Sequence, residues 1–200
     1  MIGRIVAVSL VFALAAGGAW AQQKSTRLSG TIESFDGHVL TVRSPALGEV
    51  KVNLASDLTV FGVSKATLAE VKPGAFIGVG AMPQADGTQR AIQVTVFAEV
   101  QRGLGEGFRP WARQPQGTMT NATVAETVKS VDGERLTVKY QGGEKTIVVP
   151  PDAVILAYSI GDKSELKPGA HVAIARAKKQ PDGSLQANRV NVGRGGVVPK

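Results

Sequence analysis

At residues 31–42 the chain reads TIESFDGHVLTV, and at residues 127–138 it reads TVKSVDGERLTV. The match continues downstream, where EVKPGA at 70–75 corresponds to ELKPGA at 165–170 and the Asp-Gly pair at 86–87 corresponds to the pair at 182–183. Matches in the same order along the chain, with only single-residue gaps between them, indicate two tandem copies of one module.

Each copy carries the pattern of β-strands. Leu136, Val138 and Tyr140 alternate with polar residues, which is the period of a half-buried strand. The Asp-Gly pairs lie between such runs and favour tight hairpin turns. Five or six short strands in about seventy residues predict a small OB-like β-barrel for each copy, closed or partly open. A two-sheet sandwich of the whole chain is the alternative, and the separate set of turns in each copy argues against it.

One predicted strand in each copy has a face of very small residues. Gly78 and Gly80 alternate with apolar residues in the first copy, and Ala173 and Ala175 do so in the second. Such a face is typical of a strand that another part of the chain approaches closely or that bends sharply in a small barrel.

The first 21 residues have the pattern of a secretory signal peptide. Arg4 precedes an apolar run, and Ala19-Trp20-Ala21 forms a small-x-small cleavage site. A retained membrane anchor is the alternative. No later apolar run reaches the roughly 20 residues of a membrane-spanning helix, so we expect a periplasmic mature chain without a transmembrane span. The predicted segments are the signal peptide at 1–21, a first β-barrel module at 28–98, a Gly/Pro/Arg linker at 99–117, a second β-barrel module at 118–193 and a tail at 194–200.

Composition excludes several kinds of site. The 200 residues include no Cys, so disulfides, thiol nucleophiles and cysteine-ligated metals are excluded. The two histidines, His38 and His171, occupy different places in the two copies, and no carboxylate cluster accompanies them. No Gly-x-Ser-x-Gly motif occurs. We therefore predict no catalytic residues, no metal and no cofactor, and a protein that is not an enzyme.

The positive charge is unevenly distributed. Residues 29–98 contain five basic and six acidic side chains, whereas residues 118–200 contain twelve basic and eight acidic. A solvated basic face explains this excess, and a surface that binds an anion or a partner is the sharper hypothesis. Nucleic acid is disfavoured because the second copy has only Tyr140 and Tyr158 for base stacking. The candidate anion- or partner-binding residues are Arg109, Trp111, Arg113, Arg176, Lys178, Lys179 and Arg189.

The repeat signature, Thr-x-x-Ser-x-Asp-Gly-x-x-Leu-Thr-Val followed by Lys-Pro-Gly-Ala, resembles that of an uncharacterised group of exported bacterial β-modules, a domain of unknown function. The resemblance implies the fold and export and supplies no functional residue. The expected function is that of a non-enzymatic binding or accessory protein that contacts an anionic ligand or an envelope protein. Because some relatives carry transporter labels, an accessory component of a metal or solute transport system is the alternative, and a hydrolase comes third.

Overall fold

The computed structural model describes residues 25–131 and 133–199, so the predicted signal peptide lies outside the described residues. Strands make up most of this part of the chain. The first copy contains β1 (Ser25–Phe35), β2 (Val39–Ser44), β3 (Gly48–Lys65), β4 (Phe76–Pro83) and β5 (Gln89–Val96). The second contains β7 (Thr118–Ser130), β8 (Gly133–Tyr140), β9 (Gly143–Val149), β10 (Val154–Ile160), β11 (His171–Lys179) and β12 (Leu185–Gly193). The predicted linker contains the short strand β6 (Gly107–Pro110).

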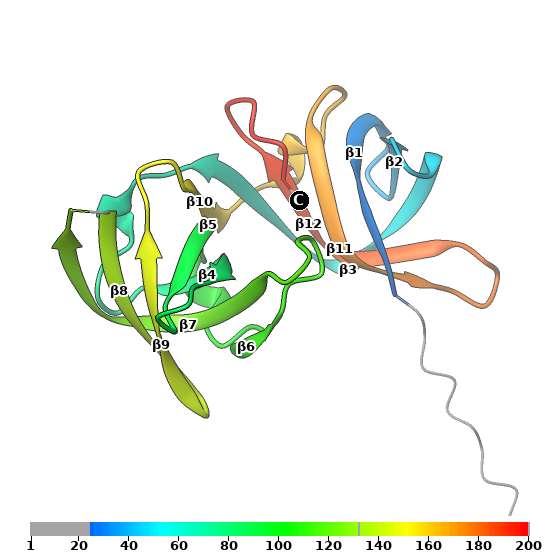
Figure 1. The fold of residues 1–200 in the computed structure, drawn as a ribbon. Helices are drawn as coiled ribbons and strands as arrows, with labels where there is room; N and C mark the ends of the chain where they lie inside the picture. Colours follow the sequence, from blue (N-terminus) through cyan, green and yellow to red (C-terminus); the bar gives the residue numbers. More distant parts are fainter. Residues whose placement is uncertain (1–24, 132, 200) are drawn as a thin grey trace, which may run out of the picture.

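Five strands form a closed barrel, which we call ring one. The antiparallel neighbours run in the order β12-β11-β1-β2-β3, and β3 then pairs with β12 in parallel, at Val60 and Val190 among other positions. In Figure 1 the blue and cyan strands of the N-terminal part therefore lie beside the orange and red strands of the C-terminal part. The apolar core of ring one includes Leu28, Ile32, Leu40, Val42, Val52, Val172, Ile174, Val190 and Val192.

A second set of pairings, ring two, follows the same plan. The strands β5-β4-β7-β8-β9 are antiparallel neighbours, and a short parallel contact of Gln89 and Arg90 with Ile147 and Val148 joins β5 to β9. Its core is separate from that of ring one and includes Ile77, Val79, Val94, Ala122, Val124, Leu136, Val138 and Ile147.

The all-β class and a closed barrel are confirmed, but the strand pairings do not follow the predicted module boundaries at 28–98 and 118–193. Ring one combines β1–β3 of the first copy with the β11–β12 hairpin of the second. Ring two combines the β4–β5 hairpin of the first copy with β7–β9 of the second. The physical reason lies in the repeat itself. Because the two hairpins are near copies, each presents the edges and apolar face that either ring requires, so sequence patterns cannot distinguish the two partners.

The two rings meet where β3 pairs antiparallel with β10, with Val63 opposite Tyr158. These two residues occupy equivalent places in the two copies, 95 positions apart, as do Asp57 and Asp152. The junction is lined by aromatic rings, since Tyr158 lies 6.4 Å from Phe61 and 5.8 Å from Phe97 between ring centroids. The exchange of hairpins therefore has approximate twofold symmetry about this strand pair.

The Asp side chains at the turns of both copies form hydrogen bonds with backbone groups two or three residues away. Asp36 accepts hydrogen bonds from the backbone N–H groups of His38 (2.8 Å) and Val39 (2.7 Å), and Asp182 accepts one from Ser184 (2.9 Å). The Val39 and His38 amides lower the pKa of Asp36 because they stabilise its ionised form. These acids thus stabilise hairpin turns.

An ion pair between Arg194 and Glu165 holds the C-terminal tail against the junction. Arg194 donates to Glu165 through Nε and Nη2, both at 2.7 Å, and to the Ser159 hydroxyl at 2.6 Å. Val197 then packs against Val63 and Leu156. The hydrogen bonds from Arg194 are the main cause of the lowered pKa of Glu165.

We predict that cysteines placed at Ser25 and Lys178 form a disulfide, because these residues face each other across β1 and β11 in the exchanged arrangement. Opposed antiparallel residues have the Cα separation that a disulfide needs. The chain has no other Cys, so mass spectrometry after mild oxidation gives an unambiguous readout. The control pair is Ser25 with Met82, the position in β4 equivalent to Lys178. Cross-linking of the control pair alone would show that each copy closes on its own hairpin.

We predict that Arg194→Met destabilises the fold by about 1 kcal/mol at neutral pH, a value that allows for solvent screening of a partly exposed pair. Since the folded state lowers the pKa of Glu165, this contribution is complete above the pKa of glutamate in the unfolded chain and is lost as pH falls through the folded value. Urea unfolding at a series of pH values measures the difference. Lys179→Met, at an exposed position, is the control with little effect at any pH. An Arg194→Met penalty that persists in acid would contradict the prediction.

Candidate functional site

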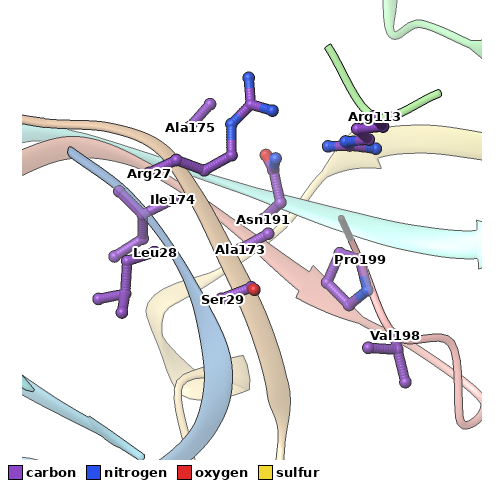
Figure 2. Close-up of a pocket in the computed structure, with 10 residues that line it drawn as sticks. All are labelled: Arg27, Leu28, Ser29, Arg113, Ala173, Ile174, Ala175, Asn191, Val198 and Pro199. Atoms are coloured by element: carbon purple, nitrogen blue, oxygen red, sulfur yellow. The ribbon is translucent and has the colours of Figure 1, made fainter. Parts of the chain in front are cut away.

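A cavity of about 370 Å³ lies beside ring one, where three distant parts of the chain meet. We call it the Arg27–Arg113 pocket. Strands β1, β11 and β12 supply its floor, the linker supplies Arg113, and the tail supplies part of its wall (Figure 2). The lining residues are Arg27, Leu28, Ser29, Arg113, Ala173, Ile174, Ala175, Asn191, Val198 and Pro199.

Two arginines supply all the charge of this lining, and it is positive. In Figure 2 the guanidinium groups of Arg27 and Arg113 lie on opposite sides of the Asn191 amide. The lining contains no carboxylate, and none of the ion pairs found among residues 25–131 and 133–199 includes either arginine. Although Arg113 keeps much of its surface in solvent, partial burial lowers the pKa of its guanidinium, and the charge of Arg27 lowers it further. An anion between the two groups would offset the repulsion from Arg27.

Asn191 supplies an unused hydrogen-bond acceptor. The residue is only 8% exposed, and its Oδ1 atom has no hydrogen-bond partner in the described part of the chain. A buried polar atom without a partner costs free energy, in the range of about 1–3 kcal/mol, unless water or a ligand satisfies it. Because Asn191 rises from β12 into the pocket, a donor on a bound molecule is positioned to supply that partner.

The floor of the pocket comes from the small-residue face predicted for β11. Both alanines line the cavity, and Ala173 is buried whereas Ala175 is exposed. Apolar atoms beneath and charged groups at the rim are the usual composition of a small-molecule site, and such sites have volumes of about 300–1,000 Å³.

The linker residues predicted as a binding patch separate into different roles. Arg109 donates to the carbonyl of Gly105 at 2.7 Å, and β6 pairs with β7. The Trp111 ring packs on β4 above Gly80. Only Arg113, two residues further along, reaches the pocket. The docked part of the linker therefore lies on ring two and presents one cation toward ring one.

The predicted basic residues of β11 and β12 belong to ring one, because the hairpin exchange carries them there. Arg176, Lys178 and Lys179 are exposed on β11. Arg189 lies with its guanidinium carbon 5.3 Å from the centroid of the Phe61 ring, a cation–π contact. None of these four side chains lines the Arg27–Arg113 pocket.

The sequence pattern does not mark Arg27, Ser29 or Asn191 as site residues. Arg27 precedes the recognised start of the first repeat, and Asn191 lies in a strand whose partners come from β3 and β11. The available signal was an Asn in an otherwise apolar strand end, which is uninformative until the strand pairing is known.

Among residues 25–131 and 133–199, no helix combines the length and apolar character needed to cross a bilayer. That part of the chain also contains no group of three or more His, Cys, Asp or Glu side chains arranged to hold a metal ion.

Comparison of the chain with protein-family models, with curated proteins and with solved structures found no match to any of the three.

Proposed function

We propose that this chain is a non-enzymatic, exported binding protein that holds a small anionic molecule in the Arg27–Arg113 pocket. One observation carries the proposal: two guanidinium groups line the same cavity, and its lining contains no acidic side chain. Guanidinium groups bind carboxylate and phosphate oxygens through paired N–H donors. Partial burial lowers the pKa of Arg113, and repulsion from Arg27 lowers it further. A ligand anion would relieve that repulsion.

The fold is suited to this role. We interpret both rings as OB-like barrels that have exchanged their C-terminal hairpins, so the floor of the pocket is built on paired strands of ring one. Three of its walls come from parts of the chain separated by about eighty residues or more, including Arg27, Arg113 and Asn191. Sites supported by strands hold their side chains more precisely than sites on free loops. A periplasmic location is the expectation from the predicted signal peptide.

We predict that acetate and inorganic phosphate raise the melting temperature of the full chain, and that the double variant Arg27→Met/Arg113→Met loses this increase. A ligand at about 100 times its Kd stabilises the folded state by about 2.7 kcal/mol. Methionine keeps the length and apolar contacts of the arginine stem and removes the charge.

The matched control is Lys178→Met/Lys179→Met, which removes two positive charges from the exposed end of β11 outside the pocket. This control should keep the full anion response. Loss of the response in the control, with retention in the arginine variant, would place anion binding on the exposed basic strand. No response of the unaltered chain to either anion would contradict this prediction.

A further inference from the structure

The surface of β4 in ring two corresponds to the floor that β11 gives the Arg27–Arg113 pocket in ring one. Gly78 of β4 lies between Asn121 of β7 and Thr95 of β5. A Cβ atom on Gly78 would lie 2.8 Å from the Phe97 ring. A Cβ atom on Gly80 would lie 2.6, 2.6 and 2.8 Å from three consecutive atoms of the Trp111 six-membered ring. Nearly equal distances to three consecutive atoms mean that the ring presents its face to the strand. Two aromatic rings therefore cover the small residues of β4.

The corresponding face of ring one lacks these rings. Ala173 of β11 is paired with Ser29 of β1 and Asn191 of β12, so it occupies the position in ring one that Gly78 occupies in ring two. Ala175 takes the place of Gly80 and is exposed. Gly193 stands where the repeat carries Phe97 in the first copy. The tail residues Val197 and Pro199 lie against Gly193. The Arg27–Arg113 pocket thus lies over Ala173 and Ala175, whose counterparts in ring two are covered by aromatic rings.

The polar groups of the pocket set the remaining chemistry of its ligand. Arg27 and Arg113 require an anionic group, and guanidinium geometry suits a carboxylate. The Asn191 Oδ1 atom requires a donor, and it is buried and without a partner among the described residues. The small side chains of the floor, Ala173 and Ala175, suit a planar apolar body.

We infer that the ligand of this pocket is a planar heteroaromatic carboxylate, with its ring face on Ala173 and Ala175, its carboxylate between the two arginines, and a ring N–H or hydroxyl that donates to Asn191. The inference rests on the proposed function, because it specifies the ligand of the same site. The cavity of about 370 Å³ accommodates a fused two-ring molecule, which has the dimensions of the Trp111 side chain that covers β4.

Isothermal titration of the full chain with matched pairs of acids tests each part of the ligand. Benzoate and cyclohexanecarboxylate differ in flatness, and we expect benzoate to bind at least about fivefold more tightly. Indole-2-carboxylate carries an N–H donor that benzofuran-2-carboxylate lacks. We expect the indole acid to bind about fivefold more tightly, as a single neutral hydrogen bond allows.

The variant Asn191→Val removes the acceptor and keeps a β-branched residue suited to a strand. In this variant the preference for the indole acid over the benzofuran acid should disappear. If the variant fails to fold, the two acid pairs measured on the unaltered chain still decide the question.

Acetate separates the inference from the function on which it depends. Binding of acetate with no preference within either acid pair would overturn the aromatic ligand and leave an anion site. Absence of binding by all five acids would overturn the proposed function itself. An indole preference that survives Asn191→Val would overturn the role of Asn191.

Discussion

The parallel contact between β3 and β12 is the constraint on which the rest of the structure depends. It closes ring one, and its counterpart between β10 and β5 connects ring two to the junction in the same register, with Ile155 opposite Val94 as Val60 is opposite Val190. Both contacts join strands from different copies of the repeat. The junction, the docked tail and the Arg27–Arg113 pocket all follow from this exchange, because without it β1 and β11 would not be neighbours.

Much of the local structure could be predicted from the sequence. Alternation in residues 136–140 marks β8, and the Asp-Gly pairs mark hairpins whose carboxylates do accept backbone hydrogen bonds, as at Asp36 and Asp182. The small residues of β4 were predicted to permit close approach, and Trp111 lies on Gly80. These predictions succeeded because each depends on side chains within a few residues of one another.

The pairing of hairpins and the composition of the pocket could not be predicted in this way. Two hairpins with the same apolar alternation fit either ring, so the choice between them depends on the connections and the junction rather than on local pattern. Arg27, Arg113 and Asn191 come from three distant segments that only the exchanged pairing brings together. The second copy does contain the excess of basic residues, and the sequence prediction placed them on a barrel formed by that copy alone. The strands β11 and β12 instead complete ring one with β1–β3.

The exchange also governs the order in which the chain can fold. The strand β1 pairs with β11, so Thr31 is opposite His171 and ring one closes only after nearly the whole chain is present. Contacts between residues so far apart in sequence slow folding, since the entropy of closing the intervening loop is lost before the contact forms. A chain synthesised from its N-terminus therefore carries β1–β3 with open edges until its last strands arrive. Ring two has all of its strands once Val149 has been synthesised, so it can close first, and ring one closes last.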